Sequence, residues 1–406
     1  MICYYYPPLI TSGVSRSLHF SKLLPQFNWT PLVLTVKNSK DPWVEKGSSP
    51  ELNHEVARTV EFNLAGICDF FHGVWSRFLK LLGIEATTNY FREFICLPDS
   101  QIAWLTTIPG LFLNSRYQLI YVTCSPFSSA VSGVFIKLLT NKPLVVDFRD
   151  PWTLNPHSQP SAIRKFINEH LERFVIKQAD ALILNTEGAK RDYCKKYPAH
   201  TQKIHCIPNG YDELTPVSVE DYQHSLASFT IAHVGTFYGN RSPRLLLEAV
   251  SSLPTPCPKF LQVGQNHPDL DSFRNSLEIK VTGMVSREEA INQMSTASLL
   301  YLKQGFEIGV SNYTAVAAKT YEYLATGLPI LLDAPPGDNA EIIKQYGINS
   351  HVVTTGNVND LREALLSALN NQRNITPKVH PEFTEKYSRT SLAKSLCNLF
   401  DSLMTR

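Results

Sequence analysis

Several features that mark large classes of protein are missing from this sequence of 406 residues. Lys and Arg number 38 against 36 Asp and Glu, so the cationic excess of a nucleic-acid-binding protein is absent. No run approaches the roughly 18 apolar residues of a membrane-spanning helix. The eight cysteines include no CxxC pair and no cluster with histidine at zinc spacing. We therefore expect a cytoplasmic protein with reduced thiols, no spanning helix and no nucleic-acid partner.

Common catalytic motifs are missing as well. The chain contains no GxxxxGK phosphate loop, no GxGxxG, no HExxH and no GxSxG, which argues against the nucleotide hydrolases, oxidoreductases, zinc proteases and serine hydrolases that carry them. The first residues, MICYYYPPLITSG, have no basic region ahead of an apolar stretch and reach two prolines at once. They therefore do not predict a secretory signal.

What the sequence does contain is a short apolar run followed by a helical segment, repeated along the chain. This pattern predicts βαβ units and parallel sheets. A turn-rich segment, Pro208-Asn209-Gly210-Tyr211-Asp212, divides it into two series. The expected strands are 2–6, 31–36, 119–123, 144–148, 181–185 and 204–207 before that segment, and 230–234, 259–263, 279–282, 299–302, 329–332 and 351–353 after it.

We expect two α/β domains, because a chain of this length is too long for one ordinary core. The first covers residues 1–210, with residues 40–98 as an insertion of helices and loops, and the second covers residues 211–385. Residues 386–406 are expected to form a helix that packs back on the first domain. Ligands bind at the carboxyl ends of the strands in open parallel sheets. The loops after the strands are therefore where chemistry is expected.

Two loops of the first half carry candidate site residues. Gly13 precedes a helix, where a glycine lets the backbone approach a phosphate and the helix N-terminus supplies amide donors, and Arg16 could add a charge. Arg149 and Asp150 crowd the end of strand 144–148, with Asp147 on the strand itself. Two alternatives stay open: the first loop is an ordinary turn, and Arg149 with Asp150 forms only a local ion pair.

The second half carries the other candidates. Lys319 and Glu322 share one face at the start of an expected helix. A lysine there can meet a phosphate, and a carboxylate one turn on can accept two hydrogen bonds from a ribose diol. Arg241 follows Gly235 in the loop after strand 230–234 and suits bidentate phosphate recognition. The alternatives are a solvated Lys-Glu ion pair and a solvent-facing arginine.

Three further segments carry polar residues or glycines, two of them at strand ends. Thr282 and Gly283 end a strand, where backbone groups could read the edge of a base. His233, at the end of another strand, is expected to be a satisfied core histidine rather than a ligand. Asp269 and Asp271 resemble a metal-binding acidic pair, but no apolar strand precedes them, so a solvated turn is expected.

Together these segments resemble the retaining glycosyltransferases of the family 4 type, a bacterial group with the GT-B fold that builds surface polysaccharides. The resemblance covers nearly the whole chain. It implies two Rossmann-like domains whose parallel sheets face each other across a cleft and close about a hinge near Asn209. The segments that carry it are YYYPPLITSGVSR, PLVVDFRDPW, ADALILNTEGAKRDY, IPNGYD, HVGTFYGNRSPRLLLEA and AKTYEYLATGLPILL.

The resemblance also implies the reaction. A hexosyl group would pass with retention from a nucleotide diphosphate sugar, UDP- or GDP-linked, to a glycan or a polyprenyl-linked saccharide, with no metal or other cofactor. Arg241 and Lys319 would neutralise the diphosphate, Gly13 would lie beneath it and Glu322 would bind the ribose. The base would lie between Thr282 and Gly283, and the acceptor near Gly13 and Asp150.

The sequence departs from the family pattern at two places. Family members usually carry two glutamates separated by seven residues, and Thr314 stands where the first would be, counted back from Glu322. Many relatives have His-Asp where this chain has Arg149-Asp150. Two alternatives therefore stay open: a nucleotide-sugar epimerase of the same fold, and a catalytically silent partner that binds a nucleotide sugar.

The segment FFHGVWSRFLK, residues 70–80, mixes aromatic and basic side chains. An amphipathic helix there would rest on a membrane surface close to a lipid-linked acceptor. The alternative is that this helix packs inside the first domain.

Overall fold

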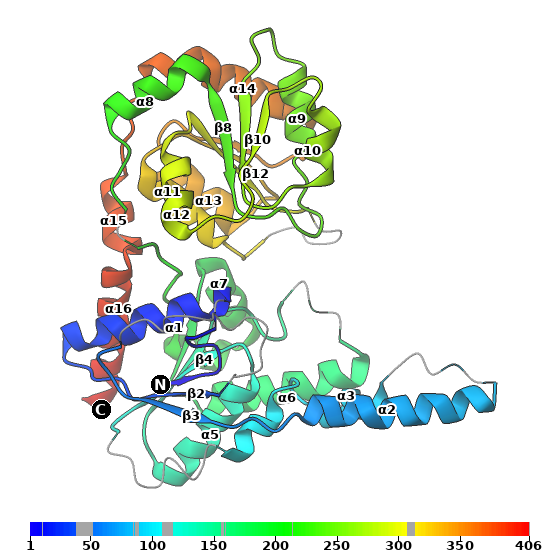
Figure 1. The fold of residues 1–406 in the computed structure, drawn as a ribbon. Coiled ribbons are helices and arrows are strands. Elements are labelled where there is room, and N and C mark those ends of the chain that lie inside the picture. Colours follow the sequence, from blue (N-terminus) through cyan, green and yellow to red (C-terminus); the bar gives the residue numbers. More distant parts are fainter. Residues whose placement is uncertain are drawn as a thin grey trace. The chain divides into compact units, whose positions relative to one another are not determined.

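The computed structural model describes residues 1–405 except 10, 38–51, 84, 86–88, 108–116, 156–157, 159, 213 and 307–312. It contains two compact units, Met1–Pro208 with Ala393–Arg406, and Asn209–Leu392. Each unit is built on a parallel sheet with helices on both faces (Figure 1).

The sheet of the first unit has the strand order β3-β2-β1-β4-β5-β6-β7 among the described residues, and every pair is parallel. Its strands are β1 (Ile2–Cys3), β2 (Val33–Val36), β3 (Val56–Thr59), β4 (Ile120–Cys124), β5 (Leu144–Phe148), β6 (Ala181–Leu184) and β7 (Ile204–Cys206). Its helices are α1 (Ser12–Leu23), α2 (Leu64–Leu81), α3 (Tyr90–Ile95), α5 (Ser128–Thr140), α6 (Ala162–Gln178) and α7 (Glu187–Lys196), with short 3-10 turns that include η3 (Pro198–Lys203).

The sheet of the second unit has the order β10-β9-β8-β11-β12-β13 and is also parallel. Its strands are β8 (Thr230–Val234), β9 (Lys259–Val263), β10 (Ile279–Val281), β11 (Leu299–Lys303), β12 (Ile330–Asp333) and β13 (His351–Val353). Its helices are α8 (Val219–Ser225), α9 (Arg244–Ser251), α10 (Pro268–Phe273), α11 (Arg287–Ser295), α12 (Ala318–Thr326), α13 (Asp338–Tyr346), α14 (Val358–Asn371) and α15 (Pro381–Tyr387).

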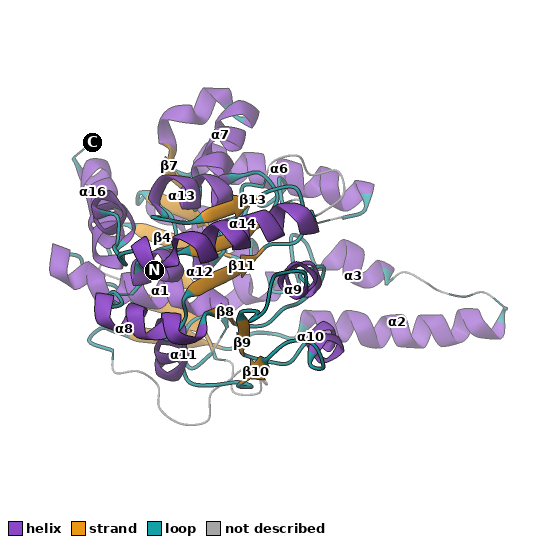
Figure 2. Ribbon diagram, turned by 90° about the horizontal axis from the view of Figure 1, so that it is seen from above, coloured by secondary structure: helices purple, strands orange, loops and turns teal. Residues whose placement is uncertain are grey.

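The central strands are buried on both faces, and this explains their nearly continuous apolar runs. β5, β6 and β11 consist entirely of buried residues, as expected when helices cover both faces of a parallel sheet. Figure 2 shows the strands between layers of helix. The predicted strands of both units are therefore confirmed, with ends that differ by at most a few residues.

Two details differ from the expectation. The segment 40–98 was expected to hold only helices and loops, but it also supplies β3, an edge strand that pairs with β2. Its sequence, VART, is short and only partly buried, so it lacks the apolar run that marked the other strands. The turn expected at Asp269 and Asp271 is the short helix α10, which begins at Pro268. Residues 40–51 lie outside the described part of the chain.

The last helix, α16 (Arg389–Met404), begins in the second unit and ends in the first. Its final turns pack against the start of the chain. Phe400 makes ring contacts with Trp29 and Tyr121, at centroid distances of 5.1 and 5.7 Å, and the Trp29 indole donates a hydrogen bond to Asp401 at 2.9 Å. Residues 393–405 therefore complete the core of the first unit.

Candidate functional site

Backbone glycines surround the carboxyl end of β8. Gly235 has φ +110°, and a Cβ on it would lie 2.4 Å from the Lys319 ammonium, so only glycine fits there. Gly235 also donates its N–H to Val263 at the end of β9, and Gly264 follows with φ +141°. The sequence identified Gly235 as a candidate. The structure shows why this position must be glycine: a lysine lies directly across it.

Lys319 is held at this strand end by its place in the first turn of α12. Its Nζ lies 3.3 Å from His233 Nε2, and His233 Nδ1 lies 3.0 Å from the carbonyl of Tyr301. A carbonyl can only accept, so Nδ1 carries the proton and Nε2 accepts from Lys319. Burial lowers the pKa of His233 well below its usual value, with a further contribution from the Lys319 charge. His233 is the core histidine that was expected, and it also positions the lysine.

Arg241 brings a second positive charge to the same place. Burial, followed by the nearby Arg241 charge, lowers the pKa of Lys319 to about 8. Arg241 itself rests on the exposed ring of Tyr238, with its guanidinium carbon 4.3 Å from the ring centre, and donates to the Tyr238 hydroxyl at 2.6 Å. Within the described residues, neither cation forms an ion pair with a carboxylate. Two cations therefore act near one strand end, and the Glu322 charge offsets them only in part.

Glu322 lies one turn after Lys319, as the i,i+3 spacing predicted, but the two do not form the solvated ion pair considered as the alternative. Its Oε1 accepts from Arg287 at 3.2 Å, and Arg287 also pairs with Asp212. Burial raises the pKa of Glu322, while Arg287 and Arg389 oppose that shift. Sequence reasoning did not select Arg287, although it begins α11 directly after the Thr282-Gly283 loop.

Thr282 and Gly283 follow β10, next to the glycine turns after β8 and β9. The Thr282 hydroxyl accepts from the Gly264 N–H at 3.3 Å and donates to the Gly283 carbonyl at 2.9 Å. Gly283 has φ +75°, and a Cβ there would meet nothing within 4 Å. The three strand ends therefore form one continuous edge, with open space beside Gly283 and with Lys319 and Arg241 further along.

In the first unit, Gly13 and Arg149 come together although 136 positions separate them in the sequence. Gly13 lies in the first turn of α1, and a Cβ on it would lie 2.5 Å from Arg149 Nη1. Thr11 precedes the helix without a side-chain cap, and its Oγ1 is buried with no partner among the described residues. An anion at this helix end would thus meet backbone amides together with the Arg149 guanidinium.

Asp150 lies beside Arg149, at 3.6 Å from its Nε, so the local ion pair considered as the alternative is present. The Asp150 side chain is 57% exposed, against 16% for Arg149. Exposed pairs of this kind add little stability. The Asp150 carboxylate therefore stays accessible at the carboxyl end of β5.

Arg16 does not present a free charge. Its guanidinium is 5% exposed and pairs with the fully buried Asp147 through two hydrogen bonds of 2.7 and 3.1 Å. It also donates to the carbonyls of Ile207 and Pro208, both at 2.8 Å. This side chain joins α1 to β5 and to the end of β7. Its donors are used inside the unit, so we remove Arg16 from the anion-binding candidates.

Thr314, at the position of the missing glutamate, is half-buried and lies four residues before α12. Glu307, the nearest preceding glutamate, lies outside the described residues. In the ranges that the structure describes, no group of three or more His, Cys, Asp or Glu side chains could hold a metal ion.

A second surface of the first unit consists of α2 and α3. One face of α2 carries apolar side chains at helical spacing that are 39–86% exposed: Ile67, Phe70, Phe71, Val74, Trp75, Phe78 and Leu81. In both ribbon views α2 extends beyond the sheet of its own unit (Figures 1 and 2). None of the described helices is long and apolar enough to span a bilayer. The alternative that residues 70–80 pack inside the domain is therefore wrong for this face.

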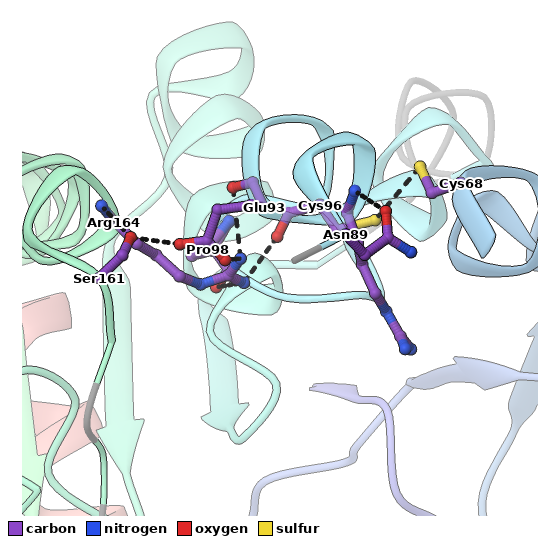
Figure 3. Close-up of polar contacts among 8 residues, drawn as sticks. Cys68, Asn89, Glu93, Cys96, Pro98, Ser161 and Arg164 are labelled. Carbon is purple, nitrogen blue, oxygen red and sulfur yellow. Dashed lines mark hydrogen bonds and ion pairs between the residues drawn. The ribbon is translucent and has the colours of Figure 1, made fainter. Parts of the chain in front are cut away.

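The opposite side of α2 is anchored through α3 and α6. Cys68 and Cys96 are buried with their sulfurs 3.9 Å apart, which joins α2 to the end of α3 (Figure 3). Arg164, on α6, donates to the carbonyls of Cys96 and Pro98 at 2.8 and 3.1 Å. The apolar face is thus presented by a helix that is anchored near its start, where Cys68 is the buried residue.

Family models match both halves of the chain. The model of Glycosyltransferase Family 4 matches residues 82–213, and that of Glycosyl transferases group 1 matches residues 228–371. Together the two matches span more than half of the sequence. No protein with a curated description matches the chain.

Solved structures share the fold at low identity. Sucrose-phosphate synthase from Thermosynechococcus elongatus has a TM-score of 0.63 and 14% identity, over 100% of this chain and 98% of that one. HepE from Anabaena, in complex with UDP, has a TM-score of 0.60 and 13% identity over 99% and 98%. UDP-GlcNAc 2-epimerase from Methanocaldococcus jannaschii has 0.55 and 11% over 99% of each chain. These likenesses confirm the expected α/β fold of two Rossmann-like domains.

Proposed function

Because the chain belongs to the family 4 glycosyltransferases with the GT-B fold, we propose that it moves a hexosyl group, with retention, from a nucleotide diphosphate sugar to a glycan hydroxyl. The observation that carries this proposal is the pair of cations near the end of β8, Lys319 and Arg241, neither of which forms an ion pair with a carboxylate among the described residues. A diphosphate would supply negative charge beyond the partial offset from Glu322. The bound UDP in HepE supports a uridine nucleotide as the first choice of donor.

The proposed reaction breaks the bond between the anomeric carbon and the diphosphate oxygen, and forms a bond from that carbon to the acceptor oxygen. The acceptor hydroxyl loses its proton, and negative charge develops on the departing diphosphate. Lys319 and Arg241 stabilise that charge without a metal ion, since preorganised cations act most strongly where charge develops. Glu322, already oriented by Arg287, would accept hydrogen bonds from the ribose hydroxyls, and Gly283 leaves room for the base.

In the first unit, we assign the acceptor to the surface beside Gly13 and Asp150. Asp150 is the exposed carboxylate at the carboxyl end of β5 and can accept a hydrogen bond from an acceptor hydroxyl. Arg149 lies over the first turn of α1, and its ion pair with Asp150 holds both side chains at this surface. The proposed acceptor is a glycan or a polyprenyl-linked saccharide of a surface polysaccharide.

Nucleotide binding by calorimetry tests the donor assignment. We expect UDP or GDP to bind the wild-type chain and to bind the Lys319→Ala/Arg241→Ala variant at least about a hundredfold more weakly, because two charge-assisted contacts are lost. Lys344→Ala, which removes an exposed lysine of the same unit, is the matched control. Equal affinity in all three proteins would remove the proposal.

Two other functions make different predictions. An epimerase would convert the sugar of the donor with no acceptor present, and NMR of the donor alone would show this. A silent binding partner, which Thr314 favours, would bind the donor and never release the nucleotide, even with acceptor added. Transfer with retention would instead give a product with the anomeric configuration of the donor.

We further propose that the exposed face of α2 rests on a lipid bilayer. Arg77 and Lys80 flank the apolar stripe on the same helix, which suits an anionic lipid surface. Contact there would keep the enzyme close to an acceptor carried on a lipid. Residues of this stripe would insert at the level of the head groups.

Liposome flotation tests the membrane contact. We expect the wild-type chain to float with phosphatidylglycerol vesicles at low salt, and Phe70→Ser/Phe78→Ser to stay at the bottom of the gradient. Phe135→Ser is the matched control, because Phe135 is a similarly exposed aromatic residue on α5. Flotation that the α2 variant retains would contradict the assignment to this face.

A further inference from the structure

The first unit has an open pocket of about 450 Å³ that the proposed reaction does not use. It lies between the ends of α5 and α6, the η3 turn and the last turns of α16. Side chains from all four elements line it, and positive charge predominates among them. Its charged and titratable residues are Lys137, Lys177, Asp180, His200, Lys203 and His205.

This pocket lies at the amino-terminal edge of the sheet. Asp180 immediately precedes β6, and its carboxylate accepts the N–H of Leu144, the first residue of β5, at 2.7 Å. Lys203 and His205 lie at the start of β7. Gly13 and Arg149 follow the carboxyl ends of β1 and β5. Since all strands are parallel, the pocket and the candidate acceptor surface occupy opposite edges of one sheet.

The pocket is lined by three lysines and one carboxylate, and only one of the lysines pairs with that carboxylate. Lys137 pairs with Asp180 at 2.5 Å, and Lys203 donates to the carbonyls of Lys177 and Ala179 at 3.0 and 2.7 Å. These contacts neutralise the aspartate and cap the end of α6. The Lys177 ammonium has no ion-pair partner among the described residues, so the capping role does not account for it.

The cations also act on one another. Burial lowers the pKa of Lys203, and the Lys137 charge lowers it further while Asp180 opposes the shift. Burial likewise lowers the pKa of His200, with added repulsion from Lys203 and Lys177. The C-terminal ends of α5 and α6, which face this pocket, each contribute only about half a negative charge. The pocket therefore keeps an excess of positive charge after its helix ends and its one carboxylate are counted.

We propose that this pocket binds a phosphate group. The excess charge matches one phosphate rather than a longer polyphosphate, and Lys177, His200 and Lys203 supply nitrogen donors from two sides. The volume lies within the range of small-molecule sites, about 300 to 1,000 Å³. Leu399 and Leu403 of α16 form one wall, so a bound phosphate would join η3 to α6 through its donors and lie against α16.

Hydrogen exchange of the full chain, read by mass spectrometry, tests this site. We expect inorganic phosphate to slow exchange in residues 176–180 and 199–205, relative to sodium chloride at equal ionic strength. The Lys177→Gln/His200→Gln variant should require about tenfold more phosphate for the same protection, because two donors are lost. Lys195→Gln, an exposed lysine on α7, is the matched control and should behave as wild type.

A second set of hydrogen-exchange experiments distinguishes two sources of the phosphate. It uses phosphatidylcholine vesicles that either contain or lack phosphatidic acid. Protection by free phosphate assigns a small soluble ligand, and protection only by phosphatidic acid vesicles assigns a lipid head group. Protection by neither, or protection that the double variant retains unchanged, would overturn the proposal. UDP binding should be the same in the double variant and in wild type, so this result is independent of the donor assignment.

Discussion

The two units carry positive charges at the same structural position, the carboxyl ends of their strands, but treat them differently. In the first unit, Arg16 is paired with buried Asp147, and Arg149 with Asp150. In the second unit, Lys319 lies against a neutral histidine and close to Arg241. In the first unit the positive charges are neutralised within the protein. In the second unit positive charge remains for a bound anion to neutralise.

This contrast separates cations that stabilise the fold from cations available to a ligand. A buried arginine depends on its partner, because removing either member of the pair leaves an uncompensated buried charge that destabilises the fold. A lysine whose pKa is lowered by burial costs stability when it is protonated, and an anion offsets that cost. The shift of Lys319 is therefore a better indicator of a ligand site than charge alone, and Arg16 shows how a charge can mislead.

The largest effect is expected from Asp147→Ala. Loss of the carboxylate leaves Arg16 buried and unpaired, which should lower the free energy of unfolding of the first unit by about 3 to 5 kcal/mol. All five tryptophans of the chain lie before residue 153, so tryptophan fluorescence in urea reports this unit selectively. Asp150→Ala is the control, since the Asp150 carboxylate is itself 57% exposed and its pair with Arg149 adds little stability. An unchanged unfolding midpoint in Asp147→Ala would show that the buried pair does not stabilise the first unit, and would contradict the difference between the two units.

Lys319→Ala should lower activity and leave stability unchanged, whereas Asp147→Ala lowers stability. We expect kcat/KM to fall by about 2 to 4 kcal/mol of transition-state stabilisation, roughly 30- to 1,000-fold, because a charge that meets the leaving diphosphate is lost. Stability of the second unit should not fall, since the lysine forms no ion pair among the described residues. Steady-state release of UDP and far-UV circular dichroism in urea measure the two quantities. A large loss of stability with normal turnover would show instead that Lys319 stabilises the fold and does not act on the diphosphate.

The pH dependence of nucleotide binding tests whether the charge of Lys319 acts on the ligand. Lys319, with a pKa of about 8, is protonated below that pH and neutral above it. UDP affinity should therefore be constant at lower pH and fall, by up to about tenfold per pH unit, above pH 8. Stability without ligand should rise over the same interval, because the unfolded chain then binds more protons. In Lys319→Arg the guanidinium stays protonated over this interval. The fall in UDP affinity above pH 8, measured by calorimetry, should therefore disappear in this variant.

Gly13→Ala should have the smallest effect. The new methyl group would overlap Arg149 Nη1, whose side chain can move away without disturbing the sheet. We expect KM for the acceptor to rise by less than about tenfold, with the affinity for the donor nucleotide nearly unchanged. Gly73→Ala, at a position with nothing within 4 Å of a new Cβ, is the control. A loss of UDP affinity in Gly13→Ala would move this glycine to the donor site.

The sequence predicted the elements that rest on local patterns. Buried parallel strands read as apolar runs, and the three-residue spacing placed Lys319 and Glu322 on one face of α12. It did not predict β3, whose half-exposed residues carry no such run. It also missed contacts between distant segments: Arg16 with Asp147 are 131 positions apart, and Lys319 with His233 are 86 apart. The role of a residue in such a pair depends on the fold. The sequence therefore predicted anion binding for Arg16, whereas its guanidinium pairs with Asp147.

The crossing of α16 from one unit into the other has a consequence for synthesis. Residues 1–208 are synthesised before the second unit, yet Trp29 and Tyr121 obtain their contact with Phe400 only after residues 209–392 have been made. The second unit, whose residues are contiguous, can fold while these aromatic rings still lack their cover. A nascent chain therefore leaves the apolar surface around Trp29 and Tyr121 uncovered until α16 emerges, and termination before Phe400 would leave that surface open to chaperones and proteases.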